Sequence, residues 1–249
     1  MSTLRRGSAF AKPCACAKIC LVAAIVIQET CPRRATVKRV RITNIAEGEE
    51  DEIYVIDSLL RNPHYMRQLG LEADYPEPPE LQWYPGLNSR QSHPIPELDE
   101  LMGDITGEAV KPFERNVHGI FRLCLEGQVG KGGVHIDWSQ WTGVYYLTLD
   151  EHAQGGTDFF RHRPSGTLRA PVYPEDWDAW EFDTADALWN DVIRPHTNDA
   201  SKWERVRHVP MKFNRLVLFR PWLWHNAGAG FGDRAENGRL IYVLSYDSA

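Results

Sequence analysis

The sequence predicts a mainly β protein with helices outside its strands, of the sandwich or jelly-roll type. Apolar runs of strand length recur from residue 120 onward, and Gly-rich turns separate them. This pattern differs from the alternation of strands and helices that a parallel β/α protein shows. The chain has 249 residues, a length that fits one domain with helical additions.

The first part of the body predicts strands followed by helices. Residues Arg39–Thr43 and Ile53–Asp57 have the pattern of short strands. Apolar residues recur near helical spacing in Ser58–Gly70, and Gly70 is expected to end this helix. Residues Pro94–Gly103 are expected to start another helix.

The second part predicts most of the sheet. Five strands are expected at Ile120–Leu125, Gly143–Leu149, Thr157–His162, Arg215–Phe219 and Arg239–Ser245. Residues Pro171–Lys202 are acidic and rich in Trp, and they predict an irregular or helical insertion between strands.

Residues 1–38 differ from the rest of the chain, and we expect them to be a disordered leader. Their apolar run, Cys20–Ile27, is too short to cross a bilayer, and no small-residue cleavage site follows it. A targeting signal and a metal or redox role for the leader's cysteines are the alternatives. The single jelly-roll domain is therefore expected to span residues 39–249.

Composition excludes some classes of function. The formal net charge is -6 and no basic stripe is interleaved with aromatic residues, which argues against a nucleic-acid binder. No segment predicts membrane insertion. Four of the five cysteines precede residue 32, so disulfides cannot staple the body, and a reducing, cytoplasmic location is expected. Nothing in the sequence indicates an oligomeric state.

The segment Gly132-Gly-Val-His135-Ile-Asp137 predicts a metal site. Side chains two residues apart on an extended chain point to the same side, so His135 and Asp137 can reach one ion. A second histidine on a neighbouring strand, His225, completes the two-histidine, one-carboxylate set that non-haem Fe(II) enzymes use. His-x-Asp alone is a weak signal, so the prediction depends on the order of the segments around it.

That order resembles the Fe(II)/2-oxoglutarate-dependent dioxygenase superfamily, in particular its prolyl-hydroxylase-like and small bacterial members of unassigned substrate. After His135 and Asp137 come Gly155-Gly-Thr-Asp-Phe-Phe160, then Trp222-Leu-Trp-His225, then Gly238-Arg239. The resemblance covers roughly residues 50–249 and implies a double-stranded β-helix, the cupin-like jelly roll. It also implies an enzyme that uses Fe(II), 2-oxoglutarate as cosubstrate and O2.

The resemblance implies roles for individual residues. His135, Asp137 and His225 are expected to be the catalytic iron ligands, and Arg239 to bind the far carboxylate of 2-oxoglutarate, to which a guanidinium offers a bidentate fork. Some relatives add a Ser or Thr two residues after this arginine, where this chain has Ile241. Tyr145 and Tyr146 are therefore candidates for the second cosubstrate-binding group.

The substrate is expected to be a small molecule, such as an amino acid or another metabolite. Related halogenases replace the aspartate, so Asp137 favours hydroxylation, although desaturation and ring closure use the same ligands. Candidate substrate contacts are His162, Trp141, Trp224 and Asn226. A cupin-like metalloenzyme that does not use 2-oxoglutarate and a catalytically silent binding relative are the alternatives, and a zinc hydrolase is disfavoured.

Overall fold

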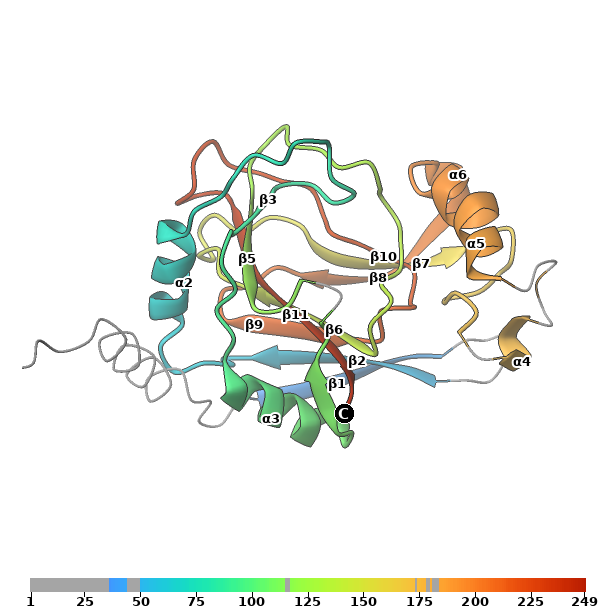
Figure 1. Cartoon of the computed structure of the whole chain (residues 1–249), viewed down its shortest axis with the longest axis horizontal. Helices are drawn as coiled ribbons and strands as arrows, with labels where there is room; N and C mark the ends of the chain where they lie inside the picture. The colour runs from blue at the N-terminus through green and yellow to red at the C-terminus, as the bar shows by residue number, and fades with distance from the viewer. Residues whose placement is uncertain (1–35, 44–49, 115–116, 173, 178–179, 181–183) are drawn as a thin grey trace, which may run out of the picture.

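Two antiparallel β-sheets form the centre of the molecule, and helices lie outside them (Figure 1). The computed structural model describes residues 36–43, 50–114, 117–172, 174–177, 180 and 184–249. The predicted class, a mainly β jelly roll with flanking helices, is confirmed. None of the helices in these ranges combines the length and the apolar character needed to cross a membrane.

The larger sheet has the strand order β1-β2-β9-β6-β11-β5-β3, and β4 pairs with β11 beside this path. Its strands come from both halves of the chain, so segments far apart in sequence become neighbours. The strands are β1 (Thr36–Thr43), β2 (Glu50–Asp57), β3 (Leu87–Asn88), β4 (Val110–Pro112), β5 (Ile120–Cys124), β6 (Trp141–Tyr146), β9 (Arg215–Phe219) and β11 (Arg239–Ser248).

The smaller sheet has the order β10-β7-β8. Its strands are β7 (Gly156–His162), β8 (Trp203–Pro210) and β10 (His225–Asn226). The register between β7 and β8 shifts between Phe159 and Phe160, as a β-bulge does. The two sheets enclose an apolar core that includes Phe159, Val217 and Phe219.

Side chains of the larger sheet alternate between two cores, because successive residues of a strand face opposite sides. On β6, Tyr146 belongs to the core between the sheets, whereas Tyr145 belongs to the core on the outer face. On β11, Ile241 and Val243 face inward in the same way. The strands of the larger sheet can therefore contribute side chains to the space between the sheets only from their inward positions.

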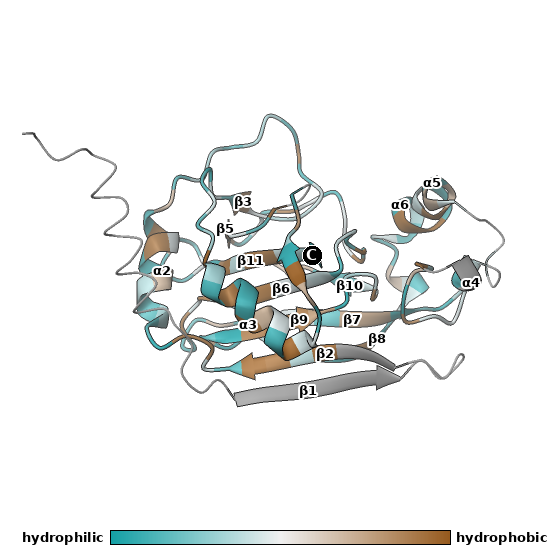
Figure 2. Cartoon of the chain, turned by 60° about the horizontal axis from the view of Figure 1, so that its bottom comes forward, coloured by the Kyte–Doolittle hydropathy of each residue, from teal (hydrophilic) through white to brown (hydrophobic). Residues whose placement is uncertain are grey.

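Helices cover the outer face of the larger sheet. These are α2 (Pro63–Glu72) and α3 (Pro96–Thr106), whose buried residues Met66, Leu98 and Met102 join the outer core. In Figure 2, α3 lies in front of the sheet, and hydrophobic colour is concentrated on the strands rather than on the loops.

The insertion between β7 and β8 forms a third core against the smaller sheet, in which Leu188 and Ile193 pack with Trp203. The expected helical or irregular insertion is thus confirmed. Its short elements are α4 (Pro174–Trp177), α5 (Ala185–Ala187), the π-helical turn η1 (Leu188–Ile193), α6 (Arg194–His196) and the 3-10 turn η2 (Ala200–Lys202).

Several predicted boundaries are wrong. Within Ser58–Gly70, where the sequence predicts a turn and then a helix ending at Gly70, the helix begins at Pro63, where the Asn62 side chain accepts a hydrogen bond from the Tyr65 amide, and it continues to Glu72. Gly70 does not end the helix. A Cβ there would lie 2.9 Å from the Phe121 ring, so this glycine lets the helix approach the sheet.

Three strands also differ from the prediction. The strand expected over Gly143–Leu149 runs from Trp141 to Tyr146. Strand β8 was not predicted, because most of its side chains are exposed or only partly buried and the sequence shows no apolar alternation. β1 begins at Thr36, within the predicted leader, and residues 1–35 lie outside the described residues.

Candidate metal centre

His135 and His225 come together because their two segments exchange backbone hydrogen bonds. The His135 amide donates to the His225 carbonyl at 2.8 Å, and the His225 amide donates to the His135 carbonyl at 3.0 Å. The Asp137 amide donates to the Pro221 carbonyl at 3.0 Å. A loop that follows β5 is thereby fixed to the start of β10, about ninety residues later in the chain.

The local chain is extended but not a regular strand. Val134 and Ile136 point into the core formed with the insertion, so His135 and Asp137 point the other way, toward the space between the sheets. His135 and Asp137 therefore point to the same side, as predicted, because successive side chains alternate along this extended segment as they do in a strand. The insertion holds this loop through Thr197, whose carbonyl accepts from the Val134 amide at 2.9 Å.

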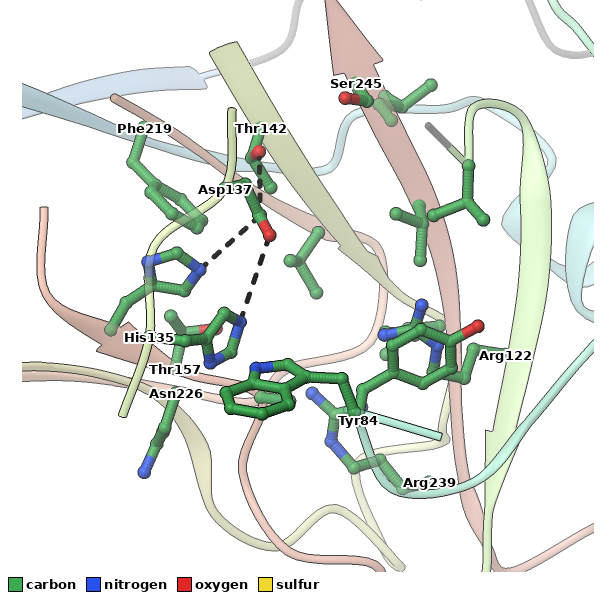
Figure 3. Close-up of a pocket in the computed structure, with 18 residues that line it drawn as sticks. Tyr84, Arg122, His135, Asp137, Thr142, Thr157, Phe219, Asn226, Arg239 and Ser245 are labelled. Carbon is green, nitrogen blue, oxygen red and sulfur yellow. Dashed lines mark hydrogen bonds and ion pairs between the residues drawn. The ribbon is translucent and has the colours of Figure 1, made fainter. Parts of the chain in front are cut away.

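Three side chains converge on one point. His135, Asp137 and His225 each offer a ligand atom, and these atoms all lie within 4.8 Å of one another. His135 Nε2 is 4.0 Å from one oxygen of Asp137, and His225 Nε2 is 3.6 Å from the other. Figure 3 shows His135 and Asp137 facing each other across this space. These separations suit atoms that share an ion better than atoms that bond directly.

Both imidazoles are oriented by their other nitrogen. His135 Nδ1 lies 2.8 Å from the Gly133 carbonyl oxygen, and His225 Nδ1 lies 2.8 Å from the Leu223 carbonyl oxygen. A carbonyl can only accept, so each Nδ1 carries the proton and each Nε2 keeps a free lone pair. This arrangement leaves both Nε2 atoms available as metal ligands.

The protonation states also suit metal binding. Burial and the nearby His225 lower the pKa of His135 to about 4, so this imidazole is neutral at pH 7. Burial alone would raise the pKa of Asp137, but the adjacent polar groups, the imidazoles of His225 and His135 and the Thr142 hydroxyl, outweigh it and hold that pKa well below its usual range. Thr142 Oγ1 donates to Asp137 at 3.2 Å. The set is thus an ionised carboxylate with a neutral imidazole beside it.

A cavity of about 90 Å³ opens beside the three ligands. Its walls include the apolar side chains Val144, Phe219 and Ile241. Its polar lining includes Tyr84, Arg122, His135, Asp137, Thr142, Thr157, His225, Asn226, Arg239 and Ser245. Asp137 also borders a second cavity of about 230 Å³, with Trp138 and Trp177 among its walls.

Arg239 is in this cavity, as the resemblance implied. Only 2% of its surface is exposed, and no carboxylate of the described residues forms an ion pair with it. Its Nε atom is buried without a hydrogen-bond partner among the residues that the structure describes. Burial lowers the pKa of this guanidinium. A buried cation without a partner is costly, so the position suits an anionic ligand.

The two tyrosine candidates, Tyr145 and Tyr146, lie on opposite faces of the larger sheet. Tyr145 lies on the outer face of the sheet, and its hydroxyl donates to Asn214 Oδ1 at 2.8 Å. The structure therefore does not bring Tyr145 to the cavity. Tyr146 is on the inward face, where its hydroxyl lies 2.7 Å from Thr157 Oγ1; Thr157 lines the cavity, but Tyr146 does not.

The four substrate candidates are also divided. Asn226 lines the cavity, and its Oδ1 is buried and has no hydrogen-bond partner in the described part of the chain. Trp141 lies on the outer face, where its indole donates to Glu108. His162 and Trp224 pack in the core that the insertion forms and do not line the cavity. The histidines without a surrounding motif also lie away from it: His64, His93, His118, His152, His196 and His208.

Sequence reasoning missed Arg122. Its guanidinium is in the same cavity as Arg239, and only 7% of the residue is exposed. The available signal was a charged residue in the middle of the apolar strand Ile120-Phe-Arg-Leu-Cys124. Such a position is unusual for a strand with both faces buried.

Comparisons with known proteins leave the function open. Residues 135–242 match the model of a family of unknown function, DUF6445, a range that runs from His135 past Arg239 but covers less than half of the chain. No curated protein matches.

A solved structure, described as the non-heme alpha ketoglutarate dependent epimerase SnoN from nogalamycin biosynthesis, is similar with 14% sequence identity. The match covers 94% of this chain and 73% of that one, with a TM-score of 0.35. Because similarity at that level supports no functional argument, the assignment depends on the site itself.

Proposed function

We propose that this chain is a non-haem Fe(II)- and 2-oxoglutarate-dependent oxygenase that oxidises a small molecule. One observation supports this most: a His-Asp-His group with free ligand atoms shares its cavity with Arg239, a buried arginine without a carboxylate partner among the described residues. The first feature suits a divalent ion, and the second suits the far end of a dicarboxylate.

The residues present fit both groups. His135, Asp137 and His225 would hold the ion from one side and leave its other side open to the cavity. Arg239 would hold the distal carboxylate of 2-oxoglutarate. The chemistry supplied by the bound groups is the oxidation of a substrate C–H bond by O2, coupled to conversion of 2-oxoglutarate into succinate and CO2.

The chain's own contribution is positioning. The Gly133 and Leu223 carbonyls keep both imidazoles in the tautomer that leaves Nε2 free, and Thr142 orients Asp137. Val144, Phe219 and Ile241 give the cavity apolar walls. A hydroxylated amino acid or other small metabolite is the product that we propose.

The proposal is tested by spectroscopy on anaerobic protein. Wild-type protein with Fe(II) and 2-oxoglutarate is expected to develop a visible metal-to-ligand charge-transfer band, whereas His225→Ala is expected to develop none. His152→Ala is the matched control, because His152 is outside the cavity and beside Glu151. Absence of the band in wild type, or an equal band in His225→Ala, would contradict the assignment.

Arg239→Met separates this function from that of a metalloenzyme without 2-oxoglutarate. Loss of the guanidinium is expected to weaken 2-oxoglutarate binding about tenfold or more while metal affinity stays near the wild-type value. Unchanged 2-oxoglutarate affinity would show that Arg239 does not bind the cosubstrate.

A further inference from the structure

Arg122 places a second buried guanidinium in the metal cavity. In the pairing of β5 with β11, Arg122 lies directly across from Ile241, and Arg239 lies across from Cys124. Arg122 and Arg239 are therefore diagonal neighbours on one face of the sheet, close enough to repel each other electrostatically. Figure 3 shows both side chains beside Tyr84.

Neutral groups hold Arg122 in place. Its Nε donates to Asn88 Oδ1 at 2.7 Å, and its Cζ lies 3.4 Å from the centre of the Tyr84 ring. The Asn88 side chain in turn donates to the Tyr84 hydroxyl. Asn88 and Tyr84 thus fix the guanidinium by one edge and one face, and its charge is left without a carboxylate partner in the described part of the chain.

The backbone brings this support into position. Asn88 on β3 pairs directly with Arg122 on β5. Gly86, just before β3, has a φ of 88°, and a Cβ there would lie 2.6 Å from the Leu123 carbonyl oxygen. A glycine is needed for β3 to lie so close to β5. The geometry around Arg122 is therefore built by the fold and is not an accident of one flexible side chain.

Arg122 lines the same cavity as the three proposed metal ligands. Its guanidinium lies near enough to Asp137 and His135 for their charges to interact. If Arg239 holds the far carboxylate of 2-oxoglutarate, the guanidinium of Arg122 remains available for another ligand in this cavity. The carbon to be oxidised must be placed in the same cavity, beside the ion.

The charges of the cavity require a further anion. Arg122 and Arg239 contribute two positive charges and Asp137 one negative charge. A divalent ion adds two positive charges, and 2-oxoglutarate adds two negative ones. One positive charge then remains buried without a counter-charge, which a folded protein avoids unless a ligand supplies it.

We propose that Arg122 binds a carboxylate of the substrate, so that the substrate class is small carboxylic acids bound as anions. This inference rests on the proposed function, because it assumes that the ion and 2-oxoglutarate occupy the rest of the cavity. Arg122 is then the residue that selects an anionic substrate and directs its reactive end toward the ion.

Propionate and propionamide form a matched pair of probes, since they have nearly the same shape and differ in charge. The protein is loaded with Mn(II) and saturated with 2-oxoglutarate, and the relaxation of the probe methyl protons is measured against probe concentration. In wild type, propionate is expected to show saturable relaxation enhancement, and propionamide is expected to show none.

Arg122→Met is expected to weaken propionate binding about tenfold or more, as loss of a charge-assisted contact does, while 2-oxoglutarate affinity stays within about twofold of wild type. Arg239→Met is expected to show the opposite pattern. Asn88→Asp is a second variant that keeps the guanidinium but gives it an internal carboxylate, and it is expected to weaken propionate binding as well.

The outcomes separate the two proposals. Wild-type protein that does not bind 2-oxoglutarate would contradict the proposed function. Wild-type protein that binds 2-oxoglutarate through Arg239, but binds propionate equally with and without Arg122, would overturn this inference alone. The inference is also overturned if Arg122→Met weakens 2-oxoglutarate as much as Arg239→Met does, because Arg122 would then hold the cosubstrate.

Discussion

Two pairs of histidines, His162 with His196 and His135 with His225, differ in one respect that matters for function. His162 uses both ring nitrogens within the protein: Nδ1 lies 2.8 Å from Ser165 Oγ, and Nε2 lies 2.9 Å from His196 Nδ1. In the candidate metal centre, His135 and His225 use only Nδ1 in this way, and Nε2 of each faces Asp137 across a gap.

Burial and pKa do not distinguish the two groups. Burial, with help from a neighbouring histidine, lowers the pKa of His162 to about 4, as it does for His135. His162 also stacks on Trp180 with the rings 6.0 Å apart. The difference is that both ring nitrogens of His162 have hydrogen-bond partners within the protein, whereas Nε2 of His135 and of His225 has none among the described residues. Unsatisfied, convergent atoms indicate a binding site, whereas a perturbed histidine by itself does not.

The largest expected effect is on metal affinity. His135→Ala removes one of three ligands and is expected to weaken Mn(II) or Fe(II) binding by at least about a hundredfold, measured by calorimetry under anaerobic conditions. His162→Ala, the matched change in the satisfied group, is expected to leave metal affinity within about threefold. Equal losses in the two variants would remove the distinction between the groups.

The stability of the metal-free protein is expected to fall as pH is lowered from about 6.5 toward 4. In this window His135 and His162 bind protons in the unfolded chain, where their pKa is near 6.5, but not in the folded chain, where their pKa is about 4. Each histidine therefore contributes a loss of about 1 kcal/mol per pH unit. Urea unfolding at several pH values measures this slope.

His162→Ala sharpens that experiment. Because the variant lacks one of the two histidines, its free energy of unfolding is expected to change less steeply with pH than that of wild type. Identical slopes would mean that His162 is not held neutral by burial.

A smaller effect is expected from the group that orients Asp137. Thr142→Val keeps the shape of the side chain but removes the 3.2 Å hydrogen bond to the carboxylate, and metal affinity is expected to fall roughly tenfold. Thr148→Val is the control, because Thr148 Oγ1 donates to the Gly238 carbonyl and does not line the cavity. A loss as large in Thr148→Val would assign the effect to stability.

The smallest effect tests the two faces of the larger sheet. Tyr145→Phe removes a hydroxyl on the outer face and is expected to leave 2-oxoglutarate affinity within about twofold of wild type. A large loss, measured by the same charge-transfer titration, would mean that Tyr145 reaches the cavity after all.

The positions of most strands and the spacing of residues within them were readable from the sequence because they are local, whereas the order of the strands in each sheet depends on long-range pairing. Most strands were located from apolar runs, and the ones missed have a weak pattern or are very short: β8 is largely exposed, β4 has three residues, and β3 and β10 have two residues each. Gly70 shows the limit of a local rule. Its role depends on Phe121, which is distant in sequence, so a helix-ending glycine could not be told from a packing glycine.

By itself, the sequence determined the metal ligands as candidates, and its resemblance to a known family added Arg239. Spacing of two residues places His135 and Asp137 on one side, and the order of later segments points to His225. Only the tertiary structure decided which other side chains join them. The register between strands decides which of Tyr145 and Tyr146 faces inward, and whether Arg122 or its neighbours do. A shift of one residue would exchange the two faces. Register is set by long-range pairing, so the position of Arg122 in the cavity could be recognised only from the folded chain.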